Sequence, residues 1–189
     1  MKIILGSSSR FRQEMLSQMG YQFSIVSPDI DEKSIRDTNP RKLVMAIALA
    51  KAEAILSKIP EPAIIITADQ VVLFKGEIRE KPTSEEEARN FLSSYGESPI
   101  ETINAVVATN SKTGKQSSGT DSTRIFLRPI PEETINSLIQ EGIIFHCAGG
   151  LRLEDPLMQP FIIEIKGSQD SLMGLPKELT RSLIEKVQE

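Results

Sequence analysis

Residues 63–74 read Ala-Ile-Ile-Ile-Thr-Ala-Asp-Gln-Val-Val-Leu-Phe, and the predicted fold is built around this segment. Its run of β-branched and apolar residues predicts a strand covered on both faces, because a half-exposed strand would alternate apolar with polar residues. Asp69 and Gln70 interrupt the run, and an unpaired carboxylate in apolar surroundings is costly. Either the strand ends at Thr67 and Asp69 caps a turn, or Asp69 is an acid held at the rim of a cleft for metal or proton chemistry.

Around this strand, predicted strands and helices alternate in the first half of the chain, and strands dominate part of the second half. This order predicts an α/β fold with a mixed sheet. The length of 189 residues suits a single domain, 1–189, with two lobes that share one sheet. The other predicted strands are 2–5, 21–26, 77–79, 100–109, 116–127 and 161–165. One helix is predicted directly after Ser7–Ser9, and four more are predicted at 40–57, 85–94, 131–141 and 174–187.

Composition excludes several classes of function. The net charge of −4 gives no overall attraction to nucleic acid or to an anionic membrane. Cys147 and His146 are the single residues of their kinds, which excludes a disulfide framework, a multi-cysteine zinc site and a histidine-rich metal site. No apolar run reaches about 18 residues, so we expect no membrane span. The N-terminal apolar run is too short for a signal peptide, and a cytoplasmic location is expected.

The segment from Gly6 to Arg12 is a candidate anion site. A strand, a Gly/Ser loop and a helix in succession point free backbone N–H groups towards an anion. Ser9 has two interpretations, because a serine at this place is more commonly only an N-cap. Arg12 falls in the first helical turn, where the helix dipole disfavours a cation. A basic residue there indicates an anionic ligand.

Two lysines are candidate ligands for such an anion. Lys51 shares a helical face with Val44, Ile47 and Ile55, so it either extends along the apolar face to reach solvent or enters an anionic pocket. Lys81 precedes Pro82 and is therefore held in extended backbone. It is either an ordinary surface lysine or a third cation of the same site.

These residues have a common interpretation. A backbone nest, three cations and one carboxylate are what a polyphosphate site with a divalent ion needs. An acidic protein must supply such a positive cluster locally. The chain contains neither a Walker Gly-x-x-x-x-Gly-Lys-Ser/Thr sequence nor Gly-x-Gly-x-x-Gly. The residues concerned are Ser7, Ser9, Arg12, Lys51, Asp69 and Lys81.

The chain resembles the Maf nucleotide pyrophosphatases, also called septum-formation-inhibitor-like proteins. The resemblance covers almost the whole chain, with motifs in family order and spacing. It departs from the family at Gly6, where alanine is usual, and at Arg10, where proline is usual. The motifs are Ile4–Arg12, Asp31-Glu32, Ala50-Lys51-Ala52, Ala68–Val71, Glu80-Lys81-Pro82, Ala148-Gly149-Gly150 and Gly174-Leu175-Pro176.

The resemblance implies hydrolysis of a nucleoside triphosphate between its α and β phosphates, which releases pyrophosphate. It also implies an elongated mixed sheet around a central cleft, as in inosine triphosphatases, and a chain that is often a homodimer. By matched position, Asp69 is the general base, and Asp69 and Glu32 hold Mg²⁺ or another divalent ion such as Mn²⁺. Lys51 and Lys81 serve catalysis because cations lower the charge penalty of attack at the α-phosphorus. The implied phosphate ligands are Ser7, Ser9, Arg12, Lys51 and Lys81.

The choice of base depends on a few further positions. Phe11, Gln70, the run 146–149 and Glu154 resemble the 7-methyl-GTP branch of the family more than its dTTP/UTP branch. A carboxylate only accepts hydrogen bonds, which matches the paired N1–H and N2–H₂ donors of guanine, whereas an amide matches uracil or thymine. The alternative is that Glu154 is simply part of a charged turn with Asp155 and Pro156.

Three other functions stay open at this point. The first is a dTTP/UTP pyrophosphatase of the same family, and the second is a non-catalytic nucleotide-binding regulator of cell division. Intact Asp69, Lys51 and Lys81 argue against the regulator, since a binding module needs no positioned base. The third is a Ser-His hydrolase that uses His146, which lies in an apolar run without a nucleophile motif. The residues do not distinguish clearance of unwanted nucleotides from a role in division.

Overall fold

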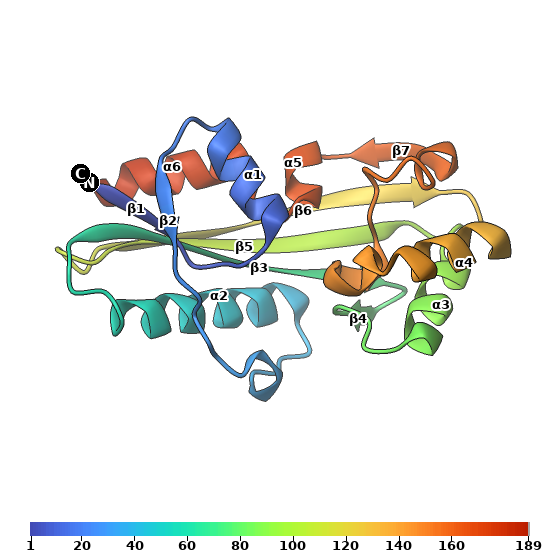
Figure 1. The fold of residues 1–189 in the computed structure, drawn as a ribbon, viewed down its shortest axis with the longest axis horizontal. Coiled ribbons are helices and arrows are strands. Elements are labelled where there is room, and N and C mark those ends of the chain that lie inside the picture. Colours follow the sequence, from blue (N-terminus) through green and yellow to red (C-terminus); the bar gives the residue numbers. More distant parts are fainter. Residues whose placement is uncertain (189) are drawn as a thin grey trace. The chain divides into compact units, whose positions relative to one another are not determined.

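The computed structural model of the chain describes residues 1–188 (Figure 1). The chain divides into two compact units. The first unit holds Met1–Asp69, Ile103–Asp121 and the described residues from Gln169 onward, and the second holds Gln70–Thr102 and Ser122–Ser168. Within residues 1–188, no helix combines the length and the hydrophobicity needed to cross a bilayer.

The strands form one seven-stranded sheet in the order β2-β1-β3-β5-β6-β7, with β4 paired to β3. β1 pairs in parallel with β2 and with β3, whereas β4 is antiparallel to β3, and β7 is antiparallel to β6. The predicted α/β fold with a mixed sheet and flanking helices is therefore confirmed. The strands are β1 (Lys2–Leu5), β2 (Phe23–Ile25), β3 (Ala63–Phe74), β4 (Glu77–Arg79), β5 (Ile100–Asn110), β6 (Gln116–Leu127) and β7 (Ile162–Lys166).

The helices agree with the sequence pattern except near residues 169–176. The last helix was predicted from residue 174, but it begins at Lys177, after a turn in which Gly174 has a non-helical φ of +81°. Gln169–Leu172 form the further short helix α5, which the sequence pattern does not predict. A helix of four residues is too short to give a periodic pattern. The longer helices are α1 (Arg10–Gln18), α2 (Pro40–Leu56), α3 (Glu85–Ser94), α4 (Glu132–Glu141) and α6 (Lys177–Gln188), and the 3-10 turns are η1 (Glu32–Ser34), η2 (Ile143–His146), η3 (Ala148–Gly150) and η4 (Gln159–Phe161).

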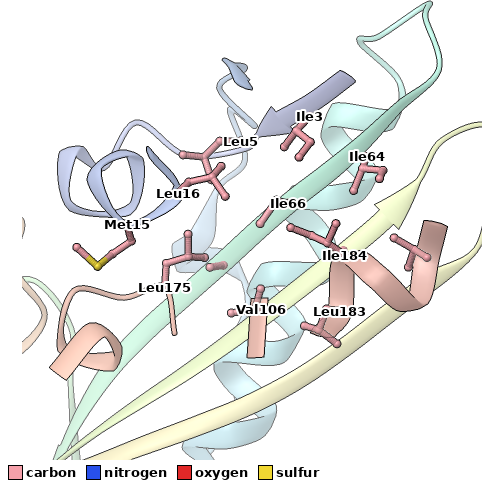
Figure 2. Close-up of a cluster of buried hydrophobic side chains, with 13 residues drawn as sticks. Ile3, Leu5, Met15, Leu16, Ile64, Ile66, Val106, Leu175, Leu183 and Ile184 are labelled. Atoms are coloured by element: carbon pink, nitrogen blue, oxygen red, sulfur yellow. The ribbon is translucent and has the colours of Figure 1, made fainter. Parts of the chain in front are cut away.

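In the first unit, β3 is covered on both faces, as its composition predicts. Ile64 and Ile66 pack against apolar residues of α1 and α6 (Figure 2). Ile65, on the opposite face, packs with Ile55 of α2. Figure 1 shows α2 on one side of the sheet and α1 with α6 on the other. The period of two along a strand therefore sorts every residue of β3 to one helix layer or the other.

The same period carries Asp69 to the α2 face. Thr67, two residues earlier, already lies there, because its hydroxyl donates to the carbonyl of Ala48 at 2.7 Å. β1 ends at Leu5, which pairs with Ile66, so Asp69 lies beyond the carboxyl end of the parallel strand next to it. Such strand ends are where open α/β sheets bind ligands. Asp69 lies within a continuous strand, and the turn-cap interpretation is wrong.

The core of the second unit contains a buried arginine. Arg79 of β4 lies over the rings of Phe74, Phe91 and Tyr95, with its Cζ atom 4.6, 4.7 and 5.1 Å from the three centroids. Its Nε donates to Glu77 at 2.8 Å. The cation is thus held by partners that all come from residues 74–95.

Candidate functional site

The centre of the candidate site is Lys51, whose ammonium lies between two carboxylates. Its Nζ is 2.8 Å from Oδ1 of Asp69 and 2.9 Å from Oε1 of Glu32. The side chains of Lys51 and Asp69 are 6% and 10% exposed, whereas that of Glu32 is 44% exposed. A charged pair this deeply buried is stable only because its members satisfy each other. The cluster joins three predicted site residues.

Helix α2 determines where Lys51 points. The helix starts at Pro40 behind the N-cap Asn39, and its buried residues recur at helical spacing, including Ile47, Lys51 and Ile55. Lys51 therefore lies on the face that packs on the sheet. Its Nζ bonds to Asp69 instead of extending to solvent, so the interpretation of Lys51 as an ordinary amphipathic surface lysine is wrong.

Glu32 reaches the cluster from the loop before α2. It begins the 3-10 turn η1, which Asp31 caps by accepting a hydrogen bond from Lys33 N at 3.1 Å. The ammonium of Lys58 fixes the preceding part of the loop, because it donates to the carboxylate of Asp29 at 2.7 Å. The turn η1 thus presents an acid to Lys51.

The Gly/Ser loop joins β1 to α1 and lies beside β3. Gly6 N donates to Ile66 O at 2.8 Å. Ser7 Oγ accepts from Ser9 N at 3.2 Å and from Nη1 of Arg12 at 3.4 Å. Ser9 is the N-cap of α1, and its Oγ accepts from Arg12 N at 3.5 Å. The N-cap interpretation of Ser9 is therefore confirmed, and its hydroxyl hydrogen is left to donate to a ligand.

Arg12 is held by backbone carbonyls. Its Nε donates to Gly174 O at 3.0 Å and its Nη1 to Ala68 O at 2.9 Å. Burial lowers the pKa of Arg12, and the carboxylates of Asp69 and Glu32 act in the opposite direction. Nη2 has no hydrogen-bond partner among residues 1–188. The guanidinium is therefore fixed through Nε and Nη1, and its Nη2 is available to bind an anion.

Two carboxylates of this cluster are suitable ligands for a hard divalent cation. Among residues 1–188, no group of three or more His, Cys, Asp or Glu side chains is arranged to hold a metal. Asp69 and Glu32 can therefore supply only part of an octahedral oxygen shell, and Mg²⁺ commonly takes the rest from water and substrate phosphates. Lys51 now bridges the two acids as a monovalent cation. The donor set fits a metal that binds together with a polyphosphate.

Three further predicted site residues belong to the second unit. Gln70 is half-buried and follows Asp69 in β3, so it points to the opposite face of the strand. Lys81 and Glu154 are exposed. Burial raises the pKa of the Cys147 thiol to about 12, Glu154 adds to this rise, and Arg152 and Lys81 oppose it. Lys81 and Glu154 thus both influence the Cys147 thiol, in opposite directions.

The sequence did not indicate two features of these surroundings. One is the carbonyl of Gly174, which accepts from Arg12 although 162 positions separate the two residues. The other is Arg152, whose Nη1 lies 2.6 Å from Asp155 and whose Nε lies 3.4 Å from Glu154. In the sequence, only the Gly-Leu-Pro motif at residues 174–176 pointed to the Gly174 carbonyl, and nothing pointed to Arg152. Phe11 is half-buried on α1, and His146 is exposed.

Comparison with known proteins gives a consistent result. A family model described as Maf-like protein matches residues 2–187. The chain is 43% identical to a protein of Dictyostelium discoideum named 7-methyl-GTP pyrophosphatase, over 98% of this chain and 96% of that protein. It is 30% identical to a protein of Vibrio vulnificus (strain YJ016) named dTTP/UTP pyrophosphatase, over 97% of each.

Among solved structures, the Staphylococcus aureus Ham1 protein is similar over 67% of this chain and 72% of that chain, with a TM-score of 0.40 and 12% identity. The match to the family model extends over almost every residue, including all the motifs around Ser7, Lys51 and Asp69. The predicted resemblance is confirmed, and this chain belongs to the Maf family.

Proposed function

We propose that this chain is an enzyme that hydrolyses a nucleoside triphosphate between the α and β phosphates, yielding the monophosphate and pyrophosphate, and that its preferred substrate is 7-methyl-GTP. The observation that carries the proposal is the buried contact of Lys51 with Asp69 and Glu32, beside Arg12. A cation between two acids, next to a second cation, suits a site that positions water against a polyphosphate.

Asp69 is the proposed base. Its Oδ1 accepts from Lys51, and Oδ2 has no hydrogen bond to residues 1–188, so Oδ2 can take a proton from water that attacks the α-phosphorus. Lys51 orients this carboxylate and contributes positive charge. Arg12 and the hydroxyls of Ser7 and Ser9 bind phosphate oxygens, and Lys81 stays a predicted phosphate ligand.

A divalent cation, Mg²⁺ or Mn²⁺, would be held by Asp69 and Glu32 together with phosphate oxygens. When bound, such an ion neutralises charge that develops on the phosphates. Lys51 would then share its two carboxylate partners with the ion, and the Glu32 side chain is accessible to an ion because it is partly exposed. Asp69 and Glu32 would thus bind a divalent cation together with the substrate phosphates.

The choice of 7-methyl-GTP rests on the relatives and on Glu154. The Dictyostelium protein that carries this substrate in its name is 43% identical, against 30% for the Vibrio dTTP/UTP pyrophosphatase. Glu154 carries a carboxylate, which accepts both N–H donors of the guanine edge. Methylation at N7 adds positive charge to the ring, which an acid also favours. Phe11 and Gln70 stay predicted specificity residues.

The test is pyrophosphate release from a panel of triphosphates with Mg²⁺, comprising 7-methyl-GTP, GTP, dTTP, UTP and ATP. We expect the highest kcat/KM for 7-methyl-GTP. Release from dTTP and UTP but not from 7-methyl-GTP would contradict only the substrate assignment and favour the pyrimidine alternative. No release from any triphosphate would contradict the enzyme itself and favour a nucleotide-binding regulator.

Three finer features are part of this proposal. The enzyme is expected in the cytoplasm, as a homodimer, without nucleic-acid partners. Sedimentation of the purified chain measures the oligomeric state, and fractionation of the source cells measures the location. Whether 7-methyl-GTP accumulates in cells that lack the protein distinguishes nucleotide clearance from a direct role in division.

A further inference from the structure

A buried hub at Ser171 leads to the carbonyl that holds Arg12. The Ser171 side chain is fully buried, and its carbonyl accepts from Nδ2 of Asn104 at 2.9 Å and from Gly174 N at 3.1 Å. Its hydroxyl donates to the carboxylate of Asp121. Gly174 O in turn accepts from Nε of Arg12. A continuous set of hydrogen bonds therefore runs from the sheet to the guanidinium.

Asn104 is an unexpected residue for its position in β5. Val106 and Ala108 lie on the same face of the strand and belong to the apolar core. Asn104 is fully buried, and its Oδ1 has no hydrogen-bond partner among residues 1–188. An unpaired buried polar atom destabilises the folded state, so Asn104 is unfavourable at this position for stability. What it provides in return is the hydrogen bond from its Nδ2 to the Ser171 carbonyl.

The turn that this bond holds has a demanding backbone. Gly174 has a φ of +81°, a backbone conformation that residues other than glycine rarely adopt. The turn is also fixed from its other side, because Asp170 accepts from Lys177 N at 2.5 Å. The direction of the Gly174 carbonyl is therefore set by the residues that anchor the turn, not by the glycine itself.

We propose that Asn104 and Ser171 are positioning residues for Arg12, and that they fix the 171–174 turn so that the Gly174 carbonyl holds the guanidinium in its phosphate-binding orientation. The proposal rests on the proposed function in one respect, which is that Arg12 binds a substrate phosphate. The geometric part, that Asn104 orders Arg12, is independent of any activity.

Asn110 provides a matched control. It is also buried in β5, and its Nδ2 donates at 2.9 Å to a backbone carbonyl, that of Val187 in α6. Its hydrogen bonds lead to the C-terminal helix and to the turn at Lys112 and Thr113. The two asparagines thus share residue type, strand and kind of bond, but they differ in the element that they anchor.

The first measurement is the hydrogen-exchange rate of the Arg12 Nε–H by NMR, with the resonance assigned by its loss in Arg12→Lys. We expect Asn104→Ala to raise this rate about tenfold, the effect of losing roughly one hydrogen bond to a charged group, and Ser171→Ala to raise it less. Asn110→Ala should leave it unchanged. An unchanged rate in both Asn104→Ala and Ser171→Ala would overturn the proposal.

The second measurement is kinetic. Asn104→Ala should raise KM for the triphosphate about tenfold with kcat nearly constant. In an Arg12→Ala background, it should have no further effect, because it acts only through Arg12. An equal increase in both backgrounds would show a general structural effect and overturn the proposal. If the wild-type chain cleaves no triphosphate, the proposed function fails, and the NMR comparison still decides whether Asn104 positions Arg12.

Discussion

Lys51 in the first unit and Arg79 in the second are two cations with nearly equal burial and different surroundings. Their side chains are 6% and 8% exposed. Arg79 stacks on three aromatic rings, and its Nη1 donates to Ser94 Oγ at 2.7 Å. Lys51 contacts two carboxylates, whereas Arg79 contacts one, that of the exposed Glu77. Burial of a charge alone therefore does not separate a structural residue from a candidate catalytic one.

The partners separate the two sites. Aromatic faces and backbone carbonyls cannot be exchanged for a ligand without opening the core, so Arg79 serves the stability of its unit. Carboxylates can exchange an ammonium for a metal or a water molecule, and Glu32 is exposed enough to do so. We expect substitutions around Lys51 to affect turnover and those around Arg79 to affect unfolding.

The largest expected effect is that of Asp69→Asn. The amide keeps the shape of the side chain but cannot accept a proton, so pyrophosphate release should fall about a thousandfold or more. Unfolding by urea measures whether the variant is folded, and nucleotide affinity should stay within a few-fold of wild type. A variant near full rate would place the base elsewhere, with Glu32 as the first alternative.

Next is the alkaline stability of the second unit. Burial raises the pKa of Tyr95 to about 12, from an ordinary value of 10.0. Below pH 10 the phenol is protonated in the folded and the unfolded state, and its contribution to stability does not depend on pH. Between pH 10 and about 12 the unfolded chain loses this proton first, so the Tyr95 contribution to the free energy of unfolding should fall by about 3 kcal/mol.

Two variants assign that loss. Tyr95→Phe should be about 1 kcal/mol less stable at pH 8, because the tyrosine hydroxyl donates to Gly149 O at 2.8 Å, and above pH 10 it should keep only the part of the decrease that comes from Cys147. The pKa of Cys147 is also raised, from 9.0 to about 12, so Cys147→Ala is the matched control and should keep the tyrosine part. A Tyr95→Phe slope between pH 10 and 12 equal to that of the wild type would contradict the assignment to Tyr95.

A smaller effect is expected for Arg79→Met, which keeps the apolar bulk but removes the cation. The free energy of unfolding should fall by about 2 kcal/mol, since the cation–aromatic contacts and hydrogen bonds are lost. Lys75→Met is the control, because Lys75 lies over the same Phe74 ring at 5.5 Å but is half exposed. Its cost should be below about 0.5 kcal/mol. A tenfold lower kcat in folded Arg79→Met would contradict the assignment of Arg79 to stability and of Lys51 to turnover.

The smallest expected effect is that of Glu32→Gln. The amide keeps a hydrogen bond to Lys51 but binds a cation poorly, so kcat should fall about tenfold and more Mg²⁺ should be needed for half-maximal rate. Asp31→Asn is the matched control, because Asp31 is an exposed neighbour that caps only η1. Similar losses in both variants would show that the loop, and not the Glu32 carboxylate, is what matters.

Local sequence patterns are enough to predict the strands, the longer helices and the side to which key residues point. The apolar run from Ala63 to Phe74 requires a strand with two covered faces, and its period of two carries Asp69 to the same face as Ile65. The helical spacing in α2 likewise buries Lys51. These are local properties, since backbone geometry fixes the direction of each side chain from its neighbours in the chain.

The partners of these side chains depend on how the elements pack together. No pattern near Arg12 specifies the Gly174 carbonyl as its acceptor, and none near Arg79 specifies three rings. The same is true of Asn104, which in sequence is one polar residue in an apolar strand. Hydrogen bonds and ion pairs between distant segments depend on how whole elements pack, and a local pattern does not contain that information. The sequence therefore identified the charged residues, and packing decided which charges are ordered for chemistry and which only stabilise the fold.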